Sequence, residues 1–151
     1  MSFIQPCFIR KNTPEIRKKL EELGYKPSYP IFIYPEVFKH IAACNFFGSK
    51  YYGVSDDEVS HHGEIKDAIK NGGMIDCGEN EELFLALAAL RDDTDINQWF
   101  IMDVEEYLYI NQGDWFLATN RNGGKHIGTQ IDPMYCHKAT VEEIIEHFKK
   151  E

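Results

Sequence analysis

The sequence predicts a single α+β domain with a mainly antiparallel sheet, one buried central helix and two or three peripheral helices. One observation is the run of eight apolar residues at Leu83–Leu90, which is typical of a helix without a solvent-facing side. A second is the recurrence of short apolar segments separated by turn residues, as in antiparallel strands. A third is the presence of amphipathic segments with clear start signals near both ends of the chain.

The N-terminal elements are a strand at Gln5–Arg10 and a surface helix that begins at Thr13-Pro14-Glu15. Threonine is a favoured N-cap, and proline is favoured at the first helical position. Gly24 provides the C-terminal stop. The apolar stripe of this helix consists of Ile16, Leu20 and Leu23. The residues expected to face water are Arg17, Lys18, Lys19, Glu21 and Glu22.

Four shorter elements are expected before the central helix. A strand is predicted at Ile31–Tyr34, between prolines 30 and 35. Gly48-Ser49 has the composition of a two-residue hairpin loop, which would pair Phe47 with Lys50 and Phe46 with Tyr51. The segment 55–60 is expected to form an acidic loop, and Glu64–Asn71 a short helix.

The central helix has Asn80 as its N-cap, with acidic residues at the positive end of the helix dipole (Glu79, Glu81 and Glu82). Burial of its leucine and phenylalanine side chains is worth ~1.5–3 kcal/mol each. We therefore expect this helix to be buried on every side and to be the largest local source of stability.

The C-terminal part is predicted to be a meander followed by a helix. The meander strands are expected at Gln98–Met102, Tyr107–Ile110 and Trp115–Thr119, with a further short strand at Ile127–Ile131. A capping box is predicted at Thr140 and Glu143. The helix that follows uses Val141, Ile144, Ile145 and Phe148 as its apolar face.

A strand, a short loop and a capped helix recur three times with similar spacing. The apolar pairs Cys7-Phe8, Met74-Ile75 and Met134-Tyr135 precede the caps Thr13, Asn80 and Thr140. Two interpretations stay open. Either the chain consists of two related halves, 1–72 and 73–151, or a common unit recurs by chance within one domain of residues 1–151.

Composition narrows the protein class. No apolar run is long enough for a signal peptide or a membrane span, so we expect a cytoplasmic protein without membrane contact. The four cysteines lack the close spacing of a zinc site and are expected to be reduced core residues (Cys7, Cys44, Cys77 and Cys136).

The net charge of −9 is concentrated in one quarter of the chain. Between positions 76 and 114 there are eleven acidic residues and a single basic one, Arg91. Phosphate recognition requires the opposite sign, so direct nucleic-acid binding through this part is disfavoured.

Adjacent aromatic residues occur within four predicted strands: Phe46-Phe47, Tyr51-Tyr52, Trp99-Phe100 and Trp115-Phe116. Neighbours in a strand point to opposite faces of the sheet. Some of these rings therefore need a cover other than the core. The alternatives are the chain's own helices, a second copy in a homodimer, or a partner or ligand.

Motifs for catalysis, metals or cofactors are not recognisable, so we predict no catalytic residues, no metal and no cofactor. Asp93-x-Asp95-x-Asn97 matches the first half of a calcium loop, but Gln98 and Val104 occupy the required glycine and glutamate positions. Cys136 and His137 would face apart in a strand, and His40 would meet Cys44 only on a helix. His61-His62 lack further spaced ligands. Gly123-Gly124-Lys125 lacks the other residues of a phosphate loop.

Two segments, CFIRKNTPEIRKKLEELGY and IDCGENEELFLALAALRDDTDINQWF, resemble small uncharacterised proteins encoded by bacterial phages and mobile elements. The resemblance covers roughly a third of the chain and implies no specific enzymatic activity. It implies a non-catalytic accessory or host-modulating role.

The functional hypothesis is a non-enzymatic acidic protein that docks on a basic face of a partner protein. The predicted contact residues are Asp92, Asp93, Asp95, Asp103, Glu105 and Glu106 for charge, Trp99 and Trp115 as anchors, and Phe47 and Tyr51 from the hairpin. One alternative is a dimeric binder of a nucleotide-like signal, with Arg10, Lys11, Lys50 and Arg121 as the available cations. The other is a Cys- or His-dependent enzyme.

Overall fold

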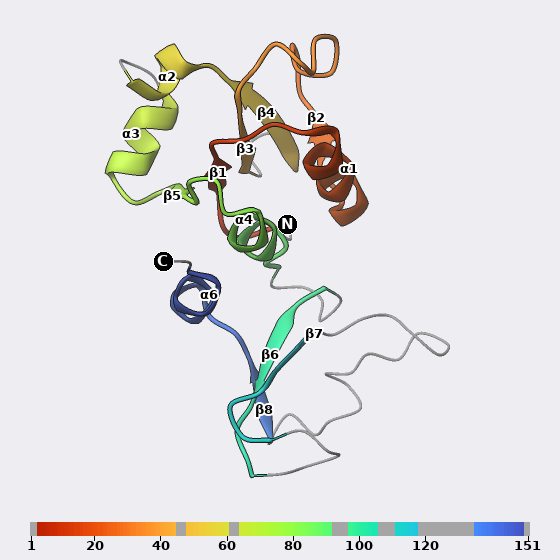
Figure 1. The fold of residues 1–151 in the computed structure, drawn as a ribbon, viewed down its shortest axis with the longest axis vertical. Helices are drawn as coiled ribbons and strands as arrows, with labels where there is room; N and C mark the ends of the chain where they lie inside the picture. The colour runs from red at the N-terminus through yellow and green to blue at the C-terminus, as the bar shows by residue number, and fades with distance from the viewer. Residues whose placement is uncertain are drawn as a thin grey trace.

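The computed structural model describes residues 3–44, 48–60, 64–91, 97–105, 111–117 and 135–149. Its helices and sheets confirm the α+β class (Figure 1). The first sheet has the strand order β2-β4-β3-β1-β5 and the second the order β7-β6-β8. The strands are β1 (Cys7–Ile9), β2 (Lys26–Pro27), β3 (His40–Cys44), β4 (Lys50–Val54), β5 (Ile75–Asp76), β6 (Trp99–Met102), β7 (Trp115–Leu117) and β8 (Cys136–Lys138). The helices are α1 (Pro14–Leu23), α2 (Asp56–Ser60), α3 (Glu64–Lys70), α4 (Glu81–Ala88) and α6 (Val141–Phe148).

Antiparallel pairing dominates both sheets, as predicted. In the first sheet β3 lies antiparallel between β1 and β4, and in the second β6 lies antiparallel between β7 and β8. The parallel pairs, β1 with β5 and β2 with β4, are made by edge strands of only two residues. Because β5 pairs with β1, a strand from the predicted second half belongs to the sheet of the first half.

Helices cover both faces of the first sheet. Alternate residues of β1 point to opposite faces, so Cys7 and Ile9 join the main core with α1 and α4, whereas Phe8 packs toward α2 and α3. In Figure 1, α4 and α6 lie between the two sheets. No helix among the described residues has both the length and the apolar character needed to cross a membrane.

Helix α4 is the predicted central helix, and Asn80 is its N-cap, accepting a hydrogen bond from the Leu83 amide. Seven of the eight residues of the apolar run are buried. Leu85 is the exception and is only partly buried, so the prediction of burial on every side is wrong at this position. A strip of α4 is therefore left without a full cover.

Helices α1 and α6 begin where predicted, at Thr13 and at the capping box of Thr140 and Glu143. The prediction that Arg17 faces water is wrong, because its side chain is only 10% exposed and forms an ion pair with Glu36. The predicted acidic loop at 55–60 is also wrong. Helix α2 occupies it, because Ser55 and Glu58 form reciprocal side chain–backbone hydrogen bonds at its start.

Three predicted strand features are corrected. Residues 31–33 form a turn and Tyr34 has no regular secondary structure, so the strand predicted at 31–34 is wrong. In the β3–β4 hairpin, Lys50 pairs with Cys44 and Tyr51 with Ala43, so the predicted pairings of Lys50 with Phe47 and of Tyr51 with Phe46 are both wrong. The predicted meander order is also wrong, since β6 pairs directly with β7 in the sheet. The strands predicted at 107–110 and 127–131 lie outside the described residues.

Candidate functional site

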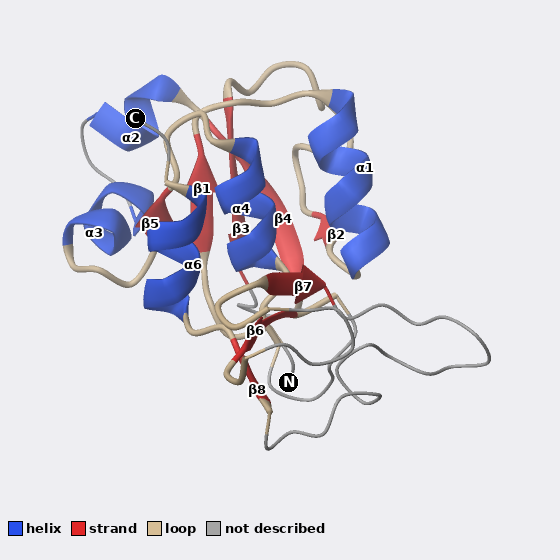
Figure 2. Cartoon of the chain, turned by 60° about the horizontal axis from the view of Figure 1, so that its bottom comes forward, coloured by secondary structure: helices blue, strands red, loops and turns tan. Residues whose placement is uncertain are grey.

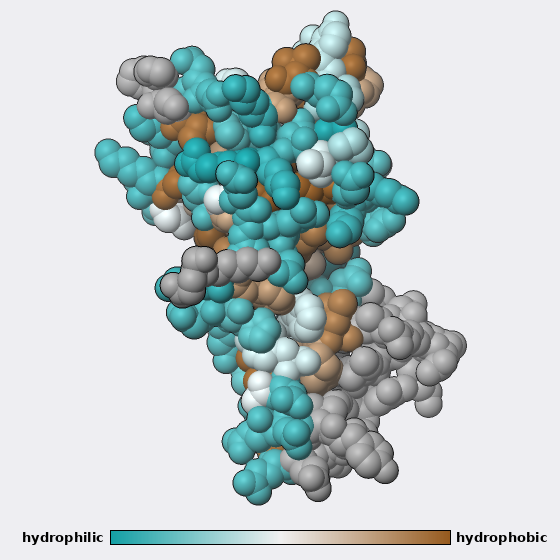
Figure 3. Space-filling view, in the orientation of Figure 1, coloured by the Kyte–Doolittle hydropathy of each residue, from teal (hydrophilic) through white to brown (hydrophobic). Residues whose placement is uncertain are grey.

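Residues 29–37, named here the aromatic loop, connect β2 to β3 and expose a group of large apolar side chains. Six large hydrophobic residues are strongly exposed in the described part of the chain, and five of them belong to this loop. They are Tyr29, Phe32, Ile33, Tyr34 and Val37, which are 48–70% exposed. In Figure 3, brown hydrophobic atoms gather at the top of the molecule, over the loop that Figure 1 draws in orange. Soluble proteins seldom cluster large apolar side chains on an exposed segment without a binding role.

The backbone of the aromatic loop is hydrogen-bonded internally and to the sheet. The Ser28 amide donates to the Tyr51 carbonyl of β4 at 3.0 Å. Within the loop, the Phe32 amide donates to the Ser28 carbonyl at 3.0 Å, and the Tyr34 amide donates to the Pro30 carbonyl at 2.9 Å. Ile31 points inward and is only 1% exposed, so it fixes the loop to the main core.

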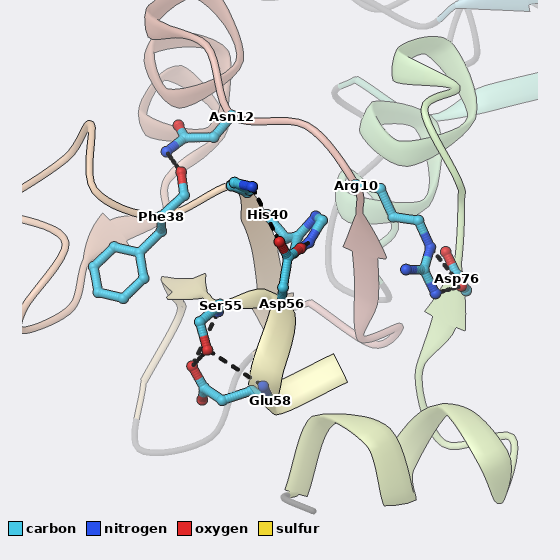
Figure 4. Close-up of polar contacts among 9 residues, drawn as sticks. Arg10, Asn12, Phe38, His40, Ser55, Asp56, Glu58 and Asp76 are labelled. Carbon is cyan, nitrogen blue, oxygen red and sulfur yellow. Dashed lines mark hydrogen bonds and ion pairs between the residues drawn. The ribbon is translucent and has the colours of Figure 1, made fainter. Parts of the chain in front are cut away.

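Asn12, just before α1, and Arg17 of α1 hold the C-terminal end of the aromatic loop. Asn12 donates through Nδ2 to the carbonyls of Pro35 and Phe38, both at 2.7 Å. Figure 4 shows the second of these bonds. The Arg17 guanidinium donates to the Asn12 Oδ1 and forms an ion pair with Glu36 at 2.6 Å. The burial of Arg17 is thus explained, since its charge serves as an anchor for the loop.

A contact between Phe38 and Gly53 joins the loop exit to the middle of β4. A Cβ atom placed on Gly53 would lie 2.3 Å from Cδ2 of the Phe38 ring, far inside van der Waals contact. The ring therefore rests directly on the glycine backbone. The aromatic loop is held at its start, its middle and its end, and its exposed side chains project from a fixed frame.

His40, at the start of β3, extends the polar network beside the loop exit. Its Nε2 lies 2.6 Å from the Asp56 carboxylate, which also pairs with Lys39 at 3.1 Å (Figure 4). The hydrogen bond from His40 is the main cause of the lowered pKa of Asp56. The Nδ1 atom of His40 is buried and has no hydrogen-bond partner among the described residues. Because an ionised carboxylate only accepts hydrogen bonds, Nε2 is the donor in the contact with Asp56.

The structure brings together the two tryptophans predicted as anchors, and α6 packs against both of them. The Trp99 and Trp115 rings are 6.2 Å apart, and each packs on Phe148, at 5.5 and 6.0 Å. Trp115 also stacks on His147 at 3.8 Å. Both indoles are partly buried by contacts within the chain.

The predicted acidic residues are only partly described. Asp103 and Glu105 are exposed, whereas Asp92, Asp93, Asp95 and Glu106 lie outside the described residues, as does Phe47. Asp103 accepts a hydrogen bond from His137 at 2.7 Å, and Glu143 binds the other ring nitrogen of His137 at 3.0 Å. Partial burial lowers the pKa of His137, but the hydrogen bonds to Glu143 and Asp103 outweigh this effect and raise it overall.

Tyr51 is wrong as a surface contact residue, because it is only 2% exposed and its hydroxyl donates to Glu21 of α1. The alternating pleat of β4 turns its ring toward α1 and the core. Sequence reasoning also missed the aromatic loop, which was interpreted as a strand. The available signal was the apolar segment between prolines 30 and 35, since closely spaced prolines favour turns over strands.

All four cysteines are buried, and none of them forms a disulfide bond. Burial raises the pKa of the Cys7 thiol well above its usual value, and burial raises the pKa of Cys77 to about 12. These two thiols are therefore protonated at neutral pH, and thiolates are the reactive form. Across the described ranges, no group of three or more His, Cys, Asp or Glu side chains is arranged to hold a metal ion.

Comparison with known proteins adds no family to this description. No protein-family model, curated protein or solved structure matches the chain.

Proposed function

We propose that this protein is a non-enzymatic binding protein and that the aromatic loop is its docking surface for a protein partner. The observation that carries the proposal is the contrast between the loop's outer and inner sides. Five large apolar side chains face solvent. The backbone beneath them is held by Ser28, Asn12 and the buried Ile31. An anchored loop with this surface is typical of a preorganised interface.

Preorganisation favours affinity. Burial of one large apolar side chain contributes ~1.5–3 kcal/mol, and ordering a flexible loop on binding would offset much of that gain. The loop hydrogen bonds already restrict the backbone, which reduces the ordering cost. Tyrosine and other aromatic residues are also enriched in the energetic centres of interfaces. A few of these side chains inserted into an apolar pocket are sufficient for a specific contact.

Charges beside the loop favour a protein partner over a membrane. The neighbouring cations Arg17 and Lys39 are already paired with Glu36 and Asp56. Attachment to anionic lipid needs an excess of basic residues near the surface, and the whole chain carries a net charge of −9. Because the charges beside the loop are paired, a groove with apolar walls on a protein fits the aromatic loop better than an anionic membrane surface does.

The basic partner surface predicted from the sequence stays part of the proposal as a second contact. Asp103, Glu105 and Asp114 are exposed on the part of the chain that contains β6 and β7. They would increase the association rate and make it salt-dependent. The resemblance to phage and mobile-element proteins supports an accessory or host-modulating role of this kind. Binding that does not change between low and high ionic strength would remove the acidic contact from the proposal.

The experiment compares partner recovery by three tagged proteins expressed in the cell that naturally contains the chain. They are the wild type, the double variant Phe32→Ser/Tyr34→Ser, and the control Ile4→Ser. Ile4 is also strongly exposed, at 49%, but lies outside the aromatic loop. Because all three positions are exposed, stability should stay within ~0.5 kcal/mol of the wild type, which thermal unfolding checks.

We expect a protein that the wild type and Ile4→Ser recover equally and that the loop variant recovers at least about tenfold less, as for loss of an interface hot spot. If every recovered protein binds the loop variant as well as the wild type, the docking proposal is wrong.

A further inference from the structure

A hollow remains beside α4, where the helices and strands around the main core do not cover it completely. Five large apolar side chains from five elements converge on it, and each is only partly buried. They are Leu23 of α1, Leu85 of α4, Trp99 of β6, Leu117 of β7 and Phe148 of α6. Its volume is about 630 Å³, within the usual range for a small-molecule site.

The walls of the hollow are regular elements. Figure 2 shows α6, α4 and α1 side by side in front of the first sheet, and α4 contacts both of the other helices. The buried residues Ala86 and Ala89 also belong to its lining. Trp99 packs at 5.5 Å from Phe148, so one wall presents two aromatic rings held by mutual contact. Such a site is formed before a ligand arrives.

Charges on the rim favour a positive ligand. Two carboxylates, Glu22 and Glu82, line the hollow together with a single ammonium, that of Lys19. Lys19 is also within 3.9 Å of Glu81, which offsets its charge. An adjoining hollow of about 740 Å³ shares Lys19, Glu82 and Leu85, and its lining has four carboxylates against three lysines. One of these four carboxylates, Asp76, is paired with Arg10 at 2.7 Å, so the adjoining hollow is close to neutral. The hollow beside α4, with two carboxylates and one ammonium, carries the net negative rim.

We propose that the hollow beside α4 binds a small apolar organic cation. The apolar body lies against Leu85 and Leu117, and the positive charge faces the Trp99 ring and the rim carboxylates. Aromatic faces attract cations, and the attraction strengthens when water is excluded. This site lies apart from the aromatic loop and does not depend on the docking proposal.

The test uses two ions of matched shape and opposite charge, tetraphenylphosphonium and tetraphenylborate. Affinities are measured by calorimetry. Tryptophan fluorescence reports on the site, because the chain has only two tryptophans and Trp99 lines the hollow. One variant, Glu22→Gln/Glu82→Gln, removes the rim charge and keeps the side-chain shape. A control, Glu15→Gln/Asp67→Asn, removes the same charge from exposed positions outside the hollow.

We expect the wild type and the control to bind the phosphonium with quenching of tryptophan fluorescence. In both proteins, the ratio of phosphonium to borate affinity should be about tenfold higher than in Glu22→Gln/Glu82→Gln, as for one to two partly screened charges. The Phe32→Ser/Tyr34→Ser variant should bind like the wild type, so this test can fail while the docking proposal stands.

Three results would overturn the assignment. One is an affinity ratio that the Glu22→Gln/Glu82→Gln variant does not change, which would indicate an uncharged apolar ligand. Another is the absence of phosphonium binding. The third is a chain that sediments as a dimer in which the hollow takes neither ion, because a second copy would then occupy it.

Discussion

Replacement of Gly53 by alanine perturbs the contact that joins the aromatic loop to the first sheet. The added Cβ would lie 2.3, 2.4 and 2.9 Å from three atoms of Phe38, whereas carbon atoms in contact are ~3.5–4.0 Å apart. Rotation of the Phe38 ring cannot relieve the contact fully, because the Phe38 Cβ also lies within 2.9 Å and the hydrogen bond from Asn12 to the Phe38 carbonyl holds the backbone in place. Overpacking of this kind costs ~1–3 kcal/mol. In a chain of 151 residues, that corresponds to a melting temperature lower by roughly 2–12 °C.

Urea unfolding of Gly53→Ala measures this cost, and Gly73→Ala is the matched control. At Gly73 the nearest atom to an added Cβ is the Ala68 carbonyl oxygen at 3.7 Å, which is an ordinary contact. The control should therefore be neutral or slightly stabilising, by up to ~1 kcal/mol. In a Phe38→Ala background, alanine at position 53 should add little further loss, because the two residues are coupled. A Gly53→Ala protein as stable as the wild type would refute the reasoning.

Three further predictions concern the core and α6. Asn80→Ala should lower the free energy of unfolding by ~1–3 kcal/mol in urea titrations. The reason is that Asn80 caps α4 and also donates a hydrogen bond to the Phe148 carbonyl at 2.6 Å. An unchanged midpoint of urea unfolding would contradict both roles. Ellman's reagent should modify no thiol of the native protein but all four cysteines in denaturant. All four thiols are buried in the folded chain, and burial raises the pKa of Cys77 to about 12. Rapid labelling of any cysteine before unfolding would contradict this prediction. Because the pKa of His137 is raised in the folded state, its stabilising contribution should be complete below its unfolded value of 6.5 and be lost as pH rises through the folded pKa. The loss should stay below ~1 kcal/mol at this exposure and vanish in His137→Gln; identical pH profiles for the two proteins would refute the assignment.

Local signals predicted the helices well. The caps Thr13, Asn80 and Thr140 act within three residues along the chain, so their hydrogen bonds can be inferred from sequence alone. The same rule would have found α2, because Ser55 and Glu58 have the spacing of a capping box. Acidic composition alone does not distinguish α2 from a loop, because acidic residues are favoured both in turns and in the first turn of a helix.

Contacts between distant residues account for what could not be predicted. Arg17 has the charge of a surface residue, but its guanidinium is buried because it forms an ion pair with Glu36 and a hydrogen bond to Asn12. The apolar residues of the aromatic loop suggest a strand until Asn12 is seen to hold the Pro35 and Phe38 carbonyls. Hairpin register likewise depended on which of several apolar residues faced the core, and the turn composition at 48–49 alone did not determine it.

The most direct test of the account is site-specific photocrosslinking in the cell that naturally contains the chain. The photoreactive residue p-benzoylphenylalanine replaces Phe32 in one protein and Ile4 in another, because both positions are strongly exposed and only Phe32 belongs to the aromatic loop. We predict one discrete adduct with a different protein from position 32 and none from position 4. Equal adduct patterns from the two positions, or a position-32 adduct only with a second copy of the chain, would contradict the claim that the aromatic loop docks on a protein partner.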